Sequence, residues 1–273
     1  MKSSNFENWI ASSVVRNSAG APLRVFHGTY HPAPHFARLT HFGTADAAIT
    51  RLFQTAYTCN NSTMIGGKVF SGFLNIQKPF KSDDCWGNSP IGSGGSDLFP
   101  HHMTEFTQAD IAYVIQPLPQ LWERPVTNKN SGFISRLWQS VSSKKTSPMS
   151  NAGVIKALKP YQQKYGYTVE APNESESWKF ISLRNELATE RFAELLTERR
   201  YDGVIYGNTE EGGQSYIILD SNQLWLDDTY LTYREHKKNG EYHGARWESE
   251  TIKENRNPPN NMPYVKDKAF RCI

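Results

Sequence analysis

Val25-Phe26-His27-Gly28-Thr29 is the stretch of this sequence from which a fold can be worked out. Its pattern predicts a short strand over Leu23–Phe26 that ends in His27 and Gly28. A glycine has no Cβ, so another molecule can approach its backbone closely at such a strand end. We therefore expect His27 and Gly28 to lie at a binding site.

The segments after this strand predict a further alternation of helix and strand. Two prolines indicate a loop that begins directly after Thr29. Thr44–Phe53 predicts a helix, because Thr44 is a typical N-cap, Asp46 lies in the positive first turn and apolar residues recur at helical spacing. Lys68–Ile76 predicts a second strand.

The later part of the chain contains its clearest helical pattern. Asn185–Arg200 has one apolar face, carboxylates near its start and arginines at its end, an order that suits the helix dipole. Asp202-Gly203 predicts the turn that follows. Two strands are then expected over Val204–Tyr206 and Ser215–Asp220, joined by the glycine-rich loop Glu210–Gln214. Helices and strands in this mixture predict an α+β fold.

Two regions fall outside this pattern. Residues 81 to about 184 give scattered helical signals and predict a mostly helical insertion. After Leu226 the chain becomes polar, which predicts a C-terminal extension of low order over residues 227–273. We therefore expect one domain over residues 1–226, interrupted by the insertion.

Composition limits the classes of function. A hydrophobic fraction of 38% with 12% aromatic residues is typical of a folded protein, and a formal charge of +3 argues against a nucleic-acid partner. The three cysteines have neither zinc nor redox spacing and favour a reducing compartment. No signal peptide and no membrane span is recognisable. The expected location is the cytoplasm, or a host cell reached without a cleavable signal peptide.

Four histidines lie close together at positions 27, 31, 35 and 41. The spacing of His27, His31 and His35 would suit a metal site on a helix. The intervening prolines forbid that helix, and no carboxylate follows before Asp46. We therefore expect no metal. No glycine pattern of a dinucleotide-binding βαβ unit is present either.

Four segments, taken in order, resemble the ADP-ribosyltransferase superfamily. They are Val25–Thr29, His41–Thr44 with the alanines behind it, Phe73–Phe80, and Tyr201–Asp220 followed by Gln223. The nearest group is the bacterial and phage one, close to the diphtheria-toxin and poly-ADP-ribose polymerase branch. The resemblance covers roughly residues 23–80 and 185–224. It implies a split β-sandwich fold with the mostly helical segment as an insertion, and NAD as the substrate.

The resemblance also implies roles for the first motifs. His27, Gly28 and Thr29 would bind NAD, with the backbone of Gly28 holding the nicotinamide carboxamide and His27 donating to a ribose hydroxyl. The ring of Phe42 would cover the nicotinamide face. Taken without the motifs, His27 reads as a satisfied buried histidine and Phe42 as a core residue.

The reaction further needs a carboxylate. Cleavage of the bond between nicotinamide and ribose passes through an oxocarbenium-like transition state, which a nearby carboxylate stabilises. Glu211 is the first candidate, with Glu210 and Gln214 as alternatives, and Gln214 otherwise as an accessory. Ser215 is expected to face the site, because neighbouring strand residues point to opposite faces. Without the motif context, Glu210 and Glu211 are surface charges in a loop.

The expected activity is mono-ADP-ribosylation of a protein side chain. Gln214 and Glu210 beside Glu211 favour arginine as the acceptor, and a bacterial effector or toxin is the expected biological class. Two alternatives within enzymology are an NAD glycohydrolase and a nucleic-acid ADP-ribosyltransferase. A third alternative is a binding module without catalysis that grips a partner through the insertion.

Overall fold

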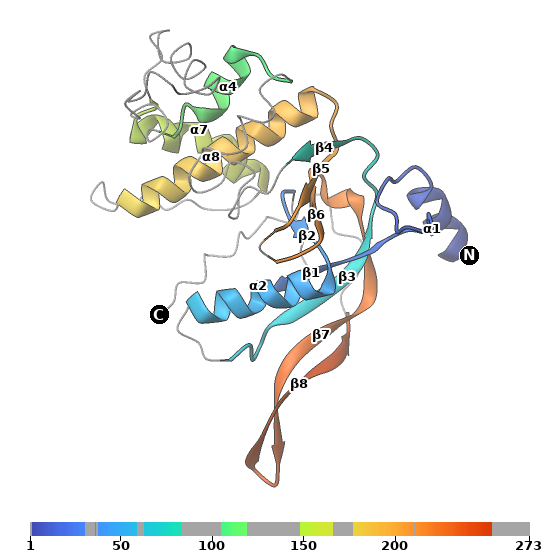
Figure 1. Cartoon of the computed structure of the whole chain (residues 1–273). Coiled ribbons are helices and arrows are strands. Elements are labelled where there is room, and N and C mark those ends of the chain that lie inside the picture. The colour runs from blue at the N-terminus through green and yellow to red at the C-terminus, as the bar shows by residue number, and fades with distance from the viewer. Residues whose placement is uncertain are drawn as a thin grey trace, which may run out of the picture. The chain divides into compact units, whose positions relative to one another are not determined.

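The computed structural model describes residues 2–30, 36, 38–58, 63–82, 105–118, 148–165, 177–209 and 211–252 (Figure 1). The chain divides into two compact units, one from Met1–Lys81 with Arg200–Ile273 and one from Ser82–Arg199. The described residues hold two sheets and five helices, which confirms the α+β class. No helix in this part of the chain is long and apolar enough to cross a membrane.

The first sheet of the first unit contains β1 (Arg24–Thr29), β3 (Lys68–Leu74), β7 (Leu224–Lys238) and β8 (Glu241–Thr251). Its strand order is β1-β3-β7-β8, and each neighbouring pair is antiparallel. The strand expected over Leu23–Phe26 therefore continues to Thr29. His27 and Gly28 lie within the ladder, where they face Phe70 and Val69 of β3.

The second sheet contains β2 (His41–Phe42), β6 (Gln214–Ile218), β5 (Gly203–Gly207) and β4 (Pro79–Ser82), in the order β2-β6-β5-β4. The strands expected over Val204–Tyr206 and from Ser215 onward are confirmed as β5 and β6, which pair antiparallel. Asp220 instead caps a short 3-10 helix at Ser221–Gln223, so β6 ends at Ile218.

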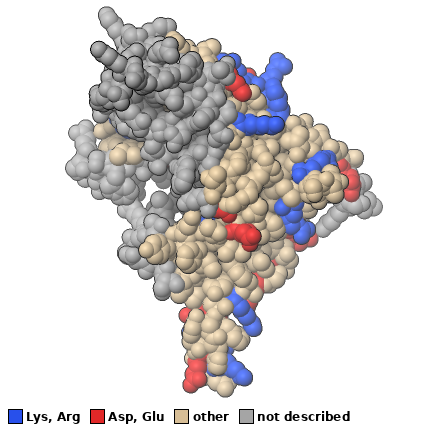
Figure 2. All heavy atoms as spheres, viewed as in Figure 1, with Lys and Arg blue, Asp and Glu red and all other residues tan. Residues whose placement is uncertain are grey.

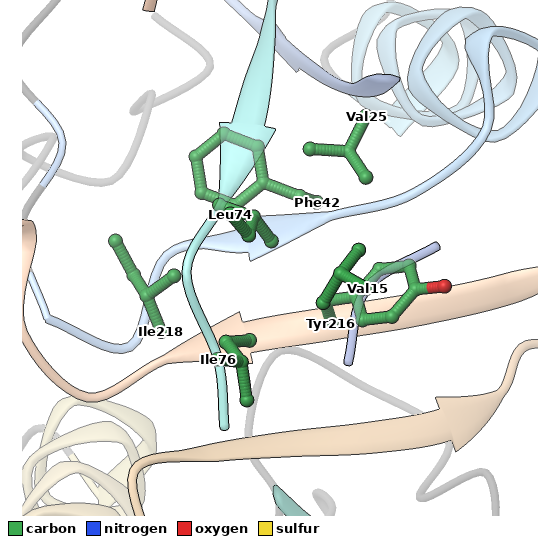
Figure 3. Close-up of a cluster of buried hydrophobic side chains, with 7 residues drawn as sticks. All are labelled: Val15, Val25, Phe42, Leu74, Ile76, Tyr216 and Ile218. Carbon is green, nitrogen blue, oxygen red and sulfur yellow. The ribbon is translucent and has the colours of Figure 1, made fainter. Parts of the chain in front are cut away.

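Helices complete the first unit. α1 spans Lys2–Ile10, and α2 spans Ala45–Thr58 and lies against β1 and β3 (Figure 1). The predicted helix is thus confirmed and runs one turn further. One core cluster contains side chains from β1, β2, β3 and β6 and from the segments before β1 and after β3 (Figure 3), namely Val15, Val25, Phe42, Leu74, Ile76, Tyr216 and Ile218. Burial of these apolar surfaces is the main term that holds the two sheets together.

The described part of the second unit is helical, with α4 at Gln108–Ile115, α7 at Asn151–Tyr165 and α8 at Ser177–Glu198. Both α4 and α7 pack against α8. Thr107 and Asp110 form a capping box at the start of α4. The helix expected over Asn185–Arg200 begins eight residues earlier, and the second unit extends to Arg199, beyond the expected end of the insertion at 184.

The expectation of a low-order extension after Leu226 is wrong as far as Thr251. These residues form most of the β7–β8 hairpin, and Leu226 itself pairs with β3. Asn239 and Gly240 both have positive φ, 54° and 83°, as a two-residue hairpin turn requires. Charges of both signs lie interspersed along the hairpin (Figure 2). Opposite charges pair on it, as in the 2.6 Å contact between Arg234 and Glu250, so polar composition here indicates an exposed ribbon.

Candidate functional site

The end of β1 carries the first two predicted site residues. Phe26 exchanges two backbone hydrogen bonds of 2.9 Å with Gly43, on the side of β1 away from β3. Backbone groups alternate sides along an antiparallel strand, so His27 points its N–H and C=O toward β3. Gly28 points its own N–H and C=O to the same side as Phe26. These two groups therefore lie on the strand edge, just beyond the link to Gly43.

Gly28 must be a glycine because of helix α2. A Cβ at this position would lie 2.2 Å from the carbonyl oxygen of Ala48 and 3.0 Å from Cγ of Leu52. The missing side chain therefore lets the backbone of α2 approach β1. The sequence had led us to expect a ligand, and not a helix, in this close approach. A ligand could contact this residue only through the backbone groups at the strand edge.

The ring of His27 is fixed by a neighbouring strand. Its Nδ1 lies 2.7 Å from the carbonyl oxygen of His41. A carbonyl oxygen can only accept, so Nδ1 carries the hydrogen, and Nε2 of the neutral ring is an acceptor. In the neutral form of the ring, Nε2 would accept a hydrogen bond from a ribose hydroxyl, whereas the expected donation to that hydroxyl would need the protonated form.

His41 is a second histidine at this place, and it is electrically neutral. Its Nδ1 lies 3.0 Å from the hydroxyl of Tyr206, and its buried Nε2 has no hydrogen-bond partner among the described residues. Burial lowers the pKa of His41 to about 4, and electrostatic interactions with Arg51 and His27 lower it by smaller amounts.

Glu211 is anchored by the loop that carries it. The side-chain amide of Asn208 donates to one Glu211 carboxylate oxygen at 3.0 Å, and the backbone N–H of Glu211 donates to the Asn208 side-chain oxygen at 2.8 Å. Asn208 also donates to Oγ of Ser215 at 3.1 Å. The side chain of Glu211 is only 16% exposed. It is therefore no freely solvated surface charge.

Helix α2 holds this loop on its other side. Nη1 of Arg51 lies 3.6 Å from the second carboxylate oxygen of Glu211. Gly213 has a φ of +83°, and a Cβ there would lie 2.8 Å from Cγ2 of Thr44, the residue directly before α2. The β5–β6 loop thus packs onto the start of the helix that covers β1. This packing brings the loop of Glu211 to the strand that carries His27.

The remaining predicted residues have different places. Phe42 is 2% exposed and lies in the core cluster (Figure 3), so its ring is not available to stack on a ligand, and that prediction is wrong.

The polar residues predicted for the site lie at the ends of β1 and β6. Gln214 begins β6, and its side-chain oxygen accepts a hydrogen bond from the Tyr216 hydroxyl at 2.9 Å. Thr29 ends β1 opposite Lys68. Ser215 is 1% exposed and contacts Asn208, so it lies behind Glu211. Glu210 lies outside the described residues.

Sequence reasoning did not single out Arg51, Asn208, Tyr206 or the ring of His41 as site residues. Asn208 had a recognisable signal, because an asparagine directly after a strand favours a turn in which its side chain binds nearby backbone. Arg51 had no such signal in the sequence, because a charged residue on an amphipathic helix usually lies on the solvent-exposed face.

No group of three histidine, cysteine or acidic side chains in the described ranges is arranged to hold a metal ion. Comparison of this chain with protein-family models, with curated proteins and with solved structures gives no match in any of the three. A functional assignment therefore depends on the chemistry of the site.

Proposed function

We propose that this chain is an ADP-ribosyltransferase-like enzyme that takes NAD as its substrate at the edge of β1. One observation carries the proposal. Glu211 follows His27 by 184 positions, yet its loop packs on α2. Arg51 of α2 contacts the Glu211 carboxylate, and the charge of Arg51 also lowers the pKa of His41. The carbonyl oxygen of His41 in turn lies within hydrogen-bond distance of the His27 ring. Two four-stranded sheets with these residues on β1 and the β5–β6 loop are compatible with a split β-sandwich.

The edge of β1 offers groups that fit a carboxamide. A nicotinamide carboxamide has one oxygen acceptor and one NH₂ donor. The N–H and C=O of Gly28 supply the complementary donor and acceptor side by side at the strand edge. His27, the preceding residue of β1, is the further group on this strand that we expect to contact the ribose.

Glu211 would stabilise the charge that develops on the ribose. When the bond between C1′ and the pyridinium nitrogen breaks, its electron pair leaves with neutral nicotinamide and positive charge grows on the sugar. A carboxylate held in a partly buried position stabilises that charge without having to reorganise. A lone pair of the acceptor then forms the new bond to C1′, and the acceptor loses its proton to solvent. With a protein side chain as acceptor, arginine being the favoured one, the product is an ADP-ribosylated protein.

Incubation with NAD labelled in its adenylate part, with and without cell lysate, tests this function. We expect labelled protein and released nicotinamide from the wild-type chain, and a loss of both of roughly 100-fold or more in Glu211→Gln. Glu235→Gln is the matched control, because Glu235 forms an ion pair with Lys237 on the hairpin. Its activity should equal that of the wild type.

The other outcomes separate the alternatives. Nicotinamide release without labelled macromolecule would identify a glycohydrolase, and label on nucleic acid would identify a nucleic-acid transferase. No nicotinamide release, together with no thermal shift by millimolar NAD, would reject the proposed enzyme and favour a binding module.

A further inference from the structure

We propose that Asn208 is a positioning residue that fixes the carboxylate of Glu211 in its reactive orientation. The inference rests on the proposed function, since it concerns how that carboxylate is held. Asn208 lies at the start of the β5–β6 loop and is 7% exposed. Its backbone N–H donates to the carbonyl of Gly213 at 2.8 Å, which closes the loop around Glu211.

The hydrogen bonds fix which way the Asn208 amide faces. The Glu211 backbone N–H can only donate, so the atom 2.8 Å from it is the amide oxygen. The NH₂ group must then face the Glu211 carboxylate, at 3.0 Å, and Oγ of Ser215, at 3.1 Å. Both of its hydrogens therefore have acceptors, and no rotation of the amide preserves all three contacts.

Ser215 connects this arrangement to the sheet. It is 1% exposed and belongs to β6, where it pairs with Tyr206 of β5. The hydrogen bond to Ser215 thus attaches Asn208 to the sheet. Through Asn208, the sheet also fixes the position of one carboxylate oxygen of Glu211. Arg51 holds the second oxygen by a looser contact of 3.6 Å from α2. Asn208 is the closer and more buried of the two contacts, which makes it the residue to test.

Asn208→Asp is the informative substitution because it keeps the shape and reverses the chemistry. The NH₂ donor becomes a carboxylate oxygen, which places a second negative charge beside Glu211. Two adjacent carboxylates resist being ionised together, so we expect the acidic limb of the pH–rate profile to move up by about one pH unit. At pH 7 we expect kcat to fall roughly 10- to 100-fold while KM for NAD changes less than about threefold.

Asn75→Asp is the matched control. Asn75 also uses its amide to tie two segments together, donating to the carbonyl of Trp9 at 2.7 Å. Its substitution also removes an amide donor, but it should leave the pH profile of turnover in place. Ser215→Ala is a second test if Asn208→Asp fails to fold. It removes one acceptor of Asn208 without adding charge, and should lower kcat about 2- to 10-fold with no shift in pH.

The experiment is nicotinamide release from NAD by the full chain between pH 4 and pH 9. A wild-type chain without turnover would overturn both the proposed function and the role of Asn208. Wild-type turnover with identical profiles for Asn208→Asp and Asn75→Asp would overturn only the role of Asn208. The same follows if Asn208→Asp fails to fold and Ser215→Ala keeps full kcat.

Discussion

Substitution of Gly28 by alanine should disrupt the contact between β1 and α2. The new Cβ would lie 2.2 Å from the carbonyl oxygen of Ala48, which is backbone and cannot rotate away. Restoring van der Waals contact requires α2 to withdraw by about 1 Å, or β1 to bend by as much. Overpacking of this kind costs about 1–3 kcal/mol, and a backbone contact belongs at the upper end of that range.

The expected result is a large loss of thermal stability. For a domain of this size about 3 kcal/mol corresponds to a decrease in Tm of roughly 6–12 °C. Gly207→Ala is the matched control, because a Cβ there has open space and the residue is also in a strand. Its Tm should stay within about 1 °C of the wild type or rise, since alanine lowers the entropy of the unfolded chain. Equal melting temperatures for the two variants would refute the stated reason for glycine at position 28.

The same shift has a consequence for the site. Arg51 lies on α2 and contacts Glu211, so withdrawal of the helix would lengthen a contact that is already 3.6 Å. If Gly28→Ala still folds at low temperature, the thermal shift produced by NAD should decrease. The decrease should exceed that seen in Gly207→Ala.

Three further predictions concern other parts of the molecule. The pKa of His41 is lowered from 6.5 to about 4 in the folded chain, so this group contributes stability that is fully present above pH 6.5 and is lost as the pH falls toward 4. Between pH 7 and pH 5 it should remove about 2 kcal/mol, and urea titrations should show that His41→Gln loses this share of the pH dependence. Phe42→Leu should cost about 1 kcal/mol and leave the affinity for NAD unchanged, because the ring is in the core; a large loss of affinity by calorimetry would restore it as a ligand contact. Thr107→Ala should destabilise α4 by about 1 kcal/mol through loss of its capping box, and hydrogen exchange should report faster opening of that helix but not of α2.

Local signals in the sequence were sufficient for several elements. Thr44 caps α2 through a 3.0 Å bond from the backbone N–H of Ala47, as an N-cap residue does. β5 was recognisable because glycines bound its apolar run at both ends, and β6 because its apolar run follows Gly212-Gly213. In each case neighbouring residues determine the element, so the sequence contains the needed information.

The hairpin and Phe42 could not be judged in the same way. Apart from Thr232, every residue of β7 and β8 is exposed or half-buried, so these strands lack the alternation of buried apolar and exposed polar residues that identifies a half-buried strand. Their one strong signal was Asn239-Gly240, which is a preferred hairpin turn. For Phe42 the sequence pattern was clear but ambiguous. An aromatic residue in a motif gives the same pattern whether its ring contacts a ligand or packs in the core. Only its neighbours in space distinguish the two.

Glu211 shows why a sequence can indicate a candidate catalytic residue more readily than the position of that residue in space. Nothing local places Glu211 near His27. The connection runs through α2, whose backbone contacts β1 at Gly28 and whose N-cap residue Thr44 contacts the loop at Gly213. Both contacts exist because a Cβ is missing, and a missing atom leaves no periodic pattern in the sequence. A substitution at Gly213 that adds a Cβ should therefore move the loop away from Thr44 and lower turnover without touching any polar group of the site. Gly212 is the control, because it has a similar φ of +86° but open space around its Cβ position, so alanine there carries the backbone strain alone.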